Sequence, residues 1–256
     1  MGVTGVAITV IAVMLGSLVA IEWIAPARRF EAVPFWSLKC AAFVPVTIAI
    51  TITVPYLLAG VIDDIKLIPG HRLGLVGGTI VGILASELLA YWAHRLHHSI
   101  GFLWRWIHQL HHSAERMDVF GAAYFHPFEI IEGNVIGLLF LNVVLGLSPD
   151  AAALAVLWQA FNGIFQHGNI RTPVWLGYFI QRPEMHGLHH QRGLHGHNYS
   201  NLPLWDLLFG TFKNPRRWEG LAGFYAGSST HTVRMLLGHD VSDDQPARSA
   251  ARTAVG

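Results

Sequence analysis

Histidine is unusually frequent in this chain of 256 residues, which has 16 of them beside 16 Asp and Glu residues. Three bunches share one spacing, in which rings recur three or four positions apart. They are HRLHH at residues 94–98, HQLHH at 108–112 and HGLHH at 186–190. Residues three and four apart lie on one face of a helix, so each bunch presents neighbouring imidazoles. Neutral imidazole binds iron, zinc and copper, and this many converging rings can hold more than one ion.

The spacing decides between two interpretations of these histidines. A lone histidine in an apolar segment is usually a hydrogen-bonded core residue rather than a ligand. Eight rings in three bunches of the same spacing favour metal binding instead. The eight are His94, His98, His108, His111, His112, His186, His189 and His190. We therefore predict a metal site built from all three bunches.

The elements around these bunches are apolar enough for a membrane. The chain is 52% hydrophobic and 13% charged, far from the average for soluble proteins. Three apolar runs, at about 3–20, 38–60 and 73–92, approach the ~20 residues that span a bilayer. Two shorter runs, at about 130–147 and 151–165, are separated by Ser-Pro-Asp, which predicts a helical hairpin. The expected fold class is all-α, a multi-pass transmembrane helical bundle.

Basic residues predict the orientation of that bundle. Arg28, Arg29 and Lys39 lie between the first two runs, and cytoplasmic loops carry an excess of such residues. Counting spans from there places His94 and His167 on the cytoplasmic side, and with them a cytoplasmic-facing histidine-rich di-metal site. The Ala-, Gly- and Arg-rich composition favours a bacterial inner membrane. The first run lacks a preceding basic stretch, so we expect it to be retained rather than cleaved as a signal peptide.

The domain organisation expected from these patterns has three parts. Residues 1–72 are N-terminal transmembrane helices, residues 73–218 form the domain with the histidine bunches, which the resemblance given below implies is catalytic, and residues 219–256 are a polar C-terminal tail. The net charge of +1, without a dense basic run, gives no reason to expect a nucleic-acid partner. The single cysteine, Cys40, excludes an internal disulfide.

The order and context of the bunches resemble those of the fatty acid hydroxylase/sterol desaturase superfamily of integral membrane di-iron enzymes. The segments that carry the resemblance are YWAHRLHH, HQLHHSAE, YFHPFE, FQHGNI and, after HGLHH, HNYSNLPLWDLLFGTF. They extend from about residue 87 to 212. One departure is that members with fatty-acyl 2-hydroxylase activity carry an additional HxxxH pair, whereas here Gly163 stands four residues before His167.

The resemblance implies two iron ions, with zinc as a possible substitute, and O2 as co-substrate. It implies nine ligands: His94, His98, His108, His111, His112, His167, His186, His189 and His190. The implied reaction is hydroxylation of an unactivated C–H bond in a membrane lipid, with desaturation as the alternative. Sterol, fatty acyl, carotenoid and ether lipid substrates all stay open. The sequence has no dinucleotide fingerprint and no CxxCH, so electrons must come from a separate ferredoxin, cytochrome b5 or reductase-type donor.

Further residues are candidates for roles around the metal ions. Glu87 lies two helical turns before His94, and Asp206 could orient an imidazole or cap a helix. The surplus rings that could support the site are His97, His126, His195 and His197. We expect His71, His231 and His239 to be surface residues.

Other classes of protein fit the pattern less well. A divalent-metal transporter is a distant alternative, because transport sites lie near mid-membrane and usually include carboxylates. A membrane haem protein would use single histidines on facing helices, and a zinc protease would need HExxH, which is absent.

Overall fold

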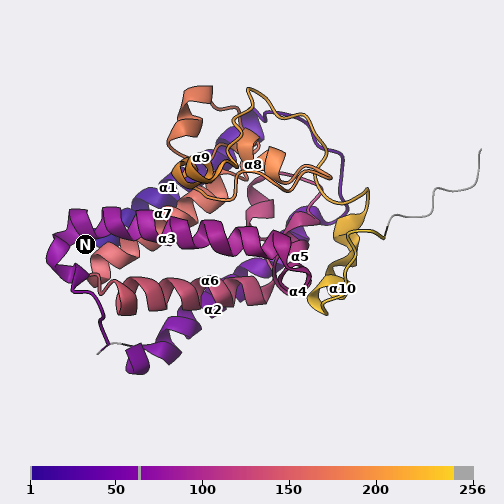
Figure 1. The fold of residues 1–256 in the computed structure, drawn as a ribbon. Helices are drawn as coiled ribbons and strands as arrows, with labels where there is room; N and C mark the ends of the chain where they lie inside the picture. The colour runs from indigo at the N-terminus through magenta and orange to yellow at the C-terminus, as the bar shows by residue number, and fades with distance from the viewer. Residues whose placement is uncertain (1, 63–64, 245–256) are drawn as a thin grey trace, which may run out of the picture.

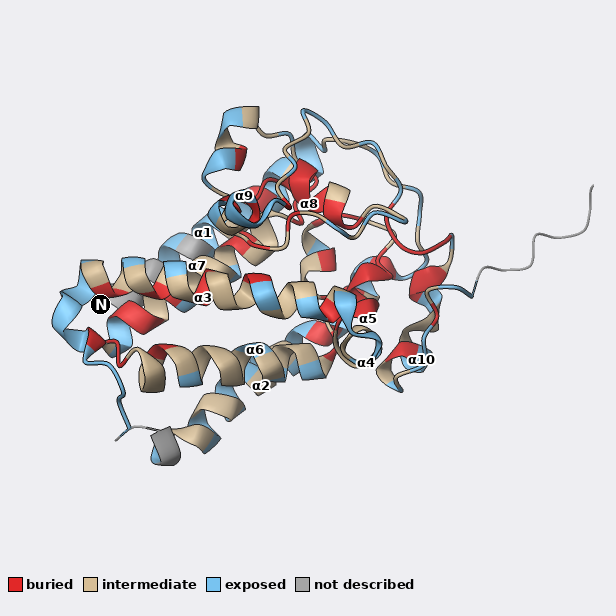
Figure 2. Cartoon of the chain, in the orientation of Figure 1, coloured by how far each residue is buried: buried red, intermediate tan, exposed pale blue. Residues whose placement is uncertain are grey.

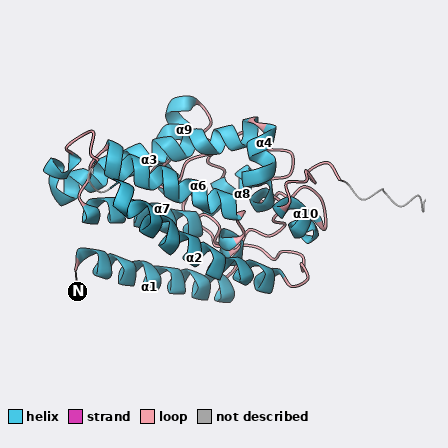
Figure 3. Ribbon diagram, turned by 90° about the horizontal axis from the view of Figure 1, so that it is seen from below, coloured by secondary structure: helices cyan, strands magenta, loops and turns pink. Residues whose placement is uncertain are grey.

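The computed structural model describes residues 2–62 and 65–244. These residues form helices joined by loops (Figure 1). Within the described residues there is no strand, and one isolated bridge joins Gln191 and Ala222. Figure 3 shows helices and connecting loops throughout. The prediction of an all-α, multi-pass helical bundle is confirmed, because three helical stretches are long and apolar enough to cross a membrane: Trp36–Gly60, Gly70–Ser99 and Pro127–Val144.

Five long helical segments form the bundle and match the five apolar runs of the sequence. They are α1 (Val3–Ile24), α2 (Trp36–Ile62), α3 (Gly74–Ser99), α6 (Pro127–Leu138), continued by the π-helix η4 (Leu139–Val144), and α7 (Pro149–Phe165). The break between the last two is local chemistry. Ser148 caps α7 by accepting a hydrogen bond from the Ala151 amide, and Pro149 occupies the first turn, where no amide donor is needed.

Helices α3 and α7 pack closely because small residues meet along their contact. A Cβ atom added at Gly78 would lie 3.0 Å from that of Ala151, and one added at Gly82 would lie 3.0 Å from that of Ala155. Helices in lipid associate through such small-residue faces, where backbones approach and van der Waals contact replaces the hydrophobic effect. This contact holds α3 against α7, and α3 carries the first histidine bunch near its C-terminal end.

Three of the shorter helices, α4 (Gly101–Leu103), α5 (Gln109–His112) and α10 (Thr232–Leu236), lie at the end of the bundle where α3 finishes. Two others, α8 (Pro183–His189) and α9 (Pro203–Phe209), lie above α3 in the view of Figure 1. The remaining short elements are η1 (Gly70–Leu73), which directly precedes α3, and η2 (Trp104–His108), η3 (Val119–Ala123), η5 (Val174–Tyr178) and η6 (Ser228–His231). Figure 2 shows buried residues concentrated around α5 and α8, whereas α2 and α6 are mostly half-buried or exposed.

The expected polar tail needs correction for residues 219–244. Met235 and Val241 are fully buried and join a core cluster with Trp36, Leu110 and Tyr124. The sequence prediction was wrong here because it judged the segment by its local composition. The apolar residues of the segment pack against residues far away in the chain, and local composition does not reveal such contacts. Residues 245–256 lie outside the described residues.

Candidate metal centre

The nine histidines expected to bind metal fall into two groups in space. Within each group, one ligand atom per residue lies within 4.8 Å of every other. Site A is His94, His98, His108, His112 and His189. Site B is His111, His167, His186 and His190. The two groups account for all nine residues without overlap, and each is large enough to hold one ion.

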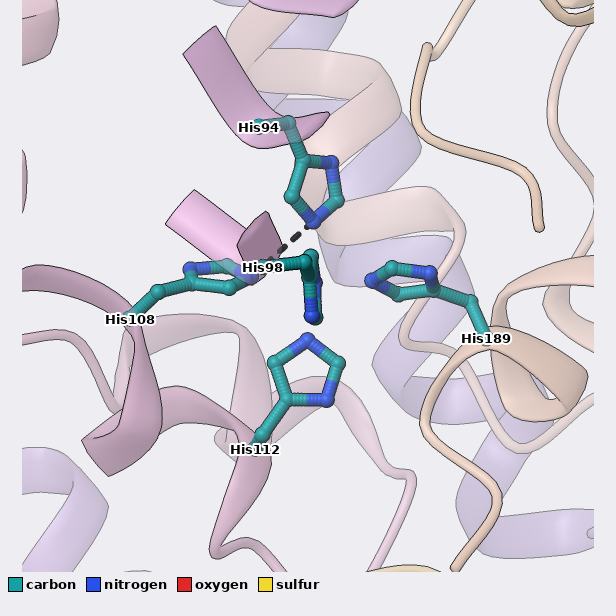
Figure 4. Close-up of side chains that lie close together, drawn as sticks. All are labelled: His94, His98, His108, His112 and His189. Atoms are coloured by element: carbon teal, nitrogen blue, oxygen red, sulfur yellow. Dashed lines mark hydrogen bonds between the residues drawn. The ribbon is translucent and has the colours of Figure 1, made fainter. Parts of the chain in front are cut away.

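Site A draws its rings from all three bunches of the sequence. Figure 4 shows the imidazoles of His94, His108, His112 and His189 arranged around one point, with His98 in the middle of the view. The Nε2 atoms of His94 and His108 are 2.9 Å apart. These rings come from α3, from the η2–α5 segment and from α8, so the site exists only when three separate parts of the chain meet.

Site B lies beside site A and includes the single histidine that follows α7. The Nε2 atom of His186 is 3.0 Å from that of His167 and 3.1 Å from that of His190. All four residues of site B are buried. The rings of His112 in site A and His190 in site B stack with centroids 4.2 Å apart, so the two sites are direct neighbours.

The paired histidines divide between the two sites. His111 belongs to site B and His112 to site A, and their rings are nearly perpendicular at 88°. His189 and His190 divide in the same way, with the rings at 83°. Consecutive side chains on a helix point about 100° apart, because there are about 3.6 residues in a turn. Each HH pair can therefore supply one ring to each site.

A π-helix precedes the second pair. Residues Trp104–His108 form η2, in which the backbone is wound more widely than in an α-helix. Such turns occur frequently at functional sites. Here η2 sets the position of His108 relative to α5, which carries His111 and His112.

Contacts between Nδ1 atoms and backbone carbonyl oxygens hold several rings so that Nε2 points into the site. The Nδ1 atom of His94 lies 2.7 Å from the Tyr199 carbonyl oxygen, and that of His189 lies 2.7 Å from the His197 carbonyl oxygen. The Nδ1 atom of His111 lies 3.3 Å from the Tyr124 carbonyl oxygen. A carbonyl partner fixes the tautomer in which Nδ1 carries the proton and Nε2 is free to bind a metal.

The ring nitrogens that point into the two sites are arranged to bind metal ions rather than to hydrogen-bond to one another. Buried ring nitrogens of His98, His112 and His189 have no hydrogen-bond partner, and buried polar atoms without a partner are rare in folded proteins. Two nitrogens bound at right angles to one ion, each about 2.1 Å from it, lie roughly 3 Å apart. The close Nε2 pairs of both sites have this spacing.

Burial also keeps the rings in the form that binds metal. Desolvation lowers the pKa of His112 and His189 well below the usual value, and neighbouring imidazoles lower it further. Burial lowers the pKa of His167 to about 3. The rings are therefore neutral at physiological pH, and neutral imidazole is the ligand form.

Glu129 is a functional residue that the sequence analysis missed. Its Oε1 atom lies 2.8 Å from Nδ1 of His108, which gives this ring the carboxylate partner often found behind metal-bound histidines. Glu132, one turn later, lies 2.8 Å from Nε2 of His97. A signal was present, since Glu129 and Glu132 stand at the start of an apolar run, and carboxylates in a membrane helix are costly and usually functional.

We expect Glu129→Gln to weaken metal binding at site A. The amide keeps the shape of the side chain but removes the charge that raises the basicity of His108, and loss of such partners costs about 10- to 100-fold in metal affinity or activity. The affinity is measured by competition with a chelator. Glu31→Gln, an exposed carboxylate remote from the site, is the control. Equal affinity of Glu129→Gln and the unaltered protein would contradict this role.

Glu87 and Asp206 act on the site through the backbone. Glu87 is fully buried and accepts hydrogen bonds from the Ser200 hydroxyl and from the Asn201 amide groups. Asp206 accepts from the Tyr199 and Ser200 backbone amides. Both carboxylates hold the segment whose Tyr199 carbonyl orients His94. No described contact joins either of them to an imidazole, so the support they give is indirect.

The surplus histidines have other surroundings. His126 caps α6, because its Nδ1 atom accepts a hydrogen bond from the Phe128 amide. The His195 ring lies against site A, with its centroid 4.8 Å from that of His112, but it is outside the ligand group. His197 contributes its backbone carbonyl to His189. His97 can form a third small group with His108 and Glu129, which shares His108 with site A.

Two adjoining cavities lead to the histidines. The inner cavity, of about 280 Å³, is lined by rings of both sites, among them His108 and His111. The outer cavity, of about 640 Å³, is predominantly apolar and lies between α1, α2, η3, α6 and α7. Five residues line both: Phe125, Glu129, Gly133, Gln159 and Gly163. We call these five residues the throat.

The chain is a helical bundle able to span a membrane, and it carries two adjacent histidine groups, each of which could hold a metal ion, beside a cavity between its helices. Residues 79–211, just over half of the chain, match the fatty acid hydroxylase family. The chain belongs to this family. The predicted resemblance is thereby confirmed.

Several curated proteins are similar to the chain. An ornithine lipid hydroxylase of Rhizobium tropici is 35% identical over 143 residues, which cover 54% of this chain and 42% of that protein. A very-long-chain aldehyde decarbonylase of Oryza sativa is 29% identical over 57% of this chain and 59% of its own length. A lathosterol oxidase of Rattus norvegicus is 30% identical over 62% and 52%, respectively. The chain spans about half the length of these relatives. No solved structure matches it significantly.

Proposed function

We propose that the chain is an iron- and O2-dependent enzyme that hydroxylates an unactivated C–H bond of a membrane lipid. The observation that carries the proposal is the pair of histidine groups at the inner end of a cavity between helices able to span a membrane. Its similarity to an ornithine lipid hydroxylase supports a lipid substrate and this reaction. Sterol desaturases are also among its relatives, which keeps desaturation as the second candidate.

The nine histidines would hold two irons, five rings at site A and four at site B. Bound iron supplies the redox chemistry by which O2 is reduced and an unactivated C–H bond is attacked, which redox-inactive zinc cannot do. The overall hydroxylation consumes O2, two electrons and two protons, and releases the alcohol and one water. The electrons come from a separate donor protein of the ferredoxin, cytochrome b5 or reductase type.

The protein's own residues position the reactants. The outer cavity is within the range of about 300–1,000 Å³ that is usual for ligand sites, and its apolar lining suits a lipid chain. The throat connects this cavity to the inner cavity, which is lined by rings of both sites. Tyr199, His197 and Glu129 hold ring orientations from outside, so the inner nitrogens stay fixed while the substrate moves.

Isotopically heavy O2 tests the reaction. Membranes that contain the protein, supplied with NADPH and a reductase system, should convert a lipid to a product with one heavy oxygen atom, detected by mass spectrometry. A desaturase would instead give a product that lacks two hydrogens and carries no label. The matched control is the His190→Ala variant in the same membranes. If no lipid changes in membranes with iron-loaded protein and a reduced donor, the proposal is wrong.

We further propose that the histidine sites face the cytoplasm of a bacterial inner membrane. Arg28, Arg29 and Lys39 support this orientation, because they favour a cytoplasmic loop between the first two helices. Lys66 lies in the loop before α3. Gly196 is exposed and follows His195, whose ring stacks on that of His98 in the last turn of α3, so the two positions lie near opposite ends of this helix.

Single cysteines at these two positions test the orientation. In a Cys40→Ser background, Lys66→Cys should react with an impermeant thiol reagent added outside spheroplasts, and Gly196→Cys only after lysis. The Cys40→Ser protein without added cysteines gives the background. The reverse labelling pattern would show that the sites face the periplasm.

A further inference from the structure

The inner cavity contains polar side chains that the two metal sites do not explain. Three of its buried side-chain acceptors have no hydrogen-bond partner: Glu129 Oε2, Gln166 Oε1 and Gln181 Oε1. Gln159 and Glu132 line the same cavity. An unpartnered buried acceptor costs about 1–3 kcal/mol, so several around one cavity indicate a ligand that brings donors.

Two of the residues that line the inner cavity are carboxylates on a membrane helix. Glu129 and Glu132 both lie in Pro127–Val144, a stretch apolar enough to span a membrane. Ionisable groups within such a helix are costly and usually face a binding site. The hydrogen bond to His108 accounts for one oxygen of Glu129, and the contact with His97 accounts for one oxygen of Glu132.

The two cavities differ in character on either side of the throat. The outer cavity has mainly aliphatic walls, including Leu15, Val44 and Ile48. The inner cavity is smaller, and beside apolar residues such as Ile136 and Phe140 it presents carboxylates, amides and imidazoles. An amphiphilic lipid matches the two cavities best when its apolar chain lies in the outer cavity and its polar head lies beside the polar groups of the inner cavity. The inner volume of about 280 Å³ limits that head to a small group.

We propose that the substrate lipid enters head first, and that its head carries hydrogen-bond donors, best supplied by a primary ammonium group. This inference rests on the proposed lipid oxidation and names the class of lipid. The ammonium donates to the unpartnered acceptors of Glu129 and Gln166 and to the carboxylate of Glu132, which lines the same cavity. The oxidised carbon then lies near the head, because the head occupies the cavity that the histidine rings line.

Binding of three 16-carbon probes to the metal-loaded protein, measured without O2, tests the inference. The probes are hexadecylamine, hexadecanol and methyl hexadecanoate, which share a chain but carry three, one and no donors, respectively, on the head group. The protein is held in nanodiscs, and the binding to empty nanodiscs is subtracted. We expect the amine to bind about 10- to 100-fold more tightly than the ester, with the alcohol between them.

Variants locate that preference in the inner cavity. Glu132→Gln should lower the affinity for the amine about tenfold and leave the alcohol and ester unchanged, because only the amine pairs with its charge. Gln166→Leu should weaken the amine and the alcohol but not the ester. Glu31→Gln, on the exposed surface, is the matched control. Metal content is measured for each variant, so that a damaged site is recognised.

The outcomes separate this inference from the proposed function. Equal binding of the amine and the ester would overturn the head-first inference, whatever the enzyme oxidises. Tighter binding of the alcohol than of the amine would overturn the assignment of an ammonium head group and favour a hydroxyl instead. Failure of the heavy-oxygen experiment would refute the oxidation without changing the binding result.

Discussion

His189→Ala and His190→Ala should each abolish turnover, and each should remove a different metal ion. These residues are neighbours in the sequence, but His189 belongs to site A and His190 to site B. Both are fully buried, and losing one ring opens the coordination of one ion. We expect each variant to retain about one ion per chain instead of two. The loss of activity should exceed the ~100-fold typical of an outer partner.

Metal content is measured by mass spectrometry on purified protein, beside oxidation of a lipid. His239→Ala is the exposed control and should retain full metal and activity. His126→Ala is the buried control, because His126 caps α6 without belonging to either group. Its loss should cost about 1 kcal/mol of stability, the usual effect of removing a helix cap, and no metal. Full metal in both His189→Ala and His190→Ala would refute the division into two sites.

Gly163→Leu should block access to the sites without disturbing them. Gly163 is one of the five throat residues, and no atom lies within 4 Å of a Cβ added there. A leucine side chain would extend into the passage between the two cavities. We expect oxidation of a long-chain lipid to fall to the background while both metal ions are retained, as measured by metal analysis and product formation on the same sample.

Gly163→Ala separates the effect of volume from the effect of losing a glycine. Alanine is favoured over glycine inside a helix by about 0.5–1 kcal/mol, so this variant should be at least as stable and remain active. Gly16→Leu is a second control, because Gly16 in α1 also has open space around it and lines neither cavity. Full activity of Gly163→Leu would show that the substrate takes another route.

The sequence by itself determined the class of fold and the candidate ligands. Runs of apolar residues of bilayer length predict spanning helices because a helix satisfies its own backbone hydrogen bonds in lipid. The Ser-Pro-Asp break predicted the start of α7, because Ser148 and Pro149 act within one turn. The repeated HxxHH spacing identified histidines that share a helix face. All of these signals are local, so they can be read without knowing which segments meet.

Only the tertiary structure decided how the histidines are divided. His111 and His112 are equivalent in the sequence pattern, but the directions of adjacent helix side chains send them to different sites. The π-helix Trp104–His108 has no periodicity signal, although it sets the position of His108 relative to α5.

The supporting contacts also depend on segments far apart in the chain. Tyr199 lies 105 residues from His94, and Glu87 lies 113 residues from Ser200, yet these contacts orient the ring. Gly163 and Glu129 come from different helices and meet at the throat. Helix packing, above all the small-residue contact of α3 with α7, determines which of these residues meet. The spacing of residues along one segment carries no information about such contacts.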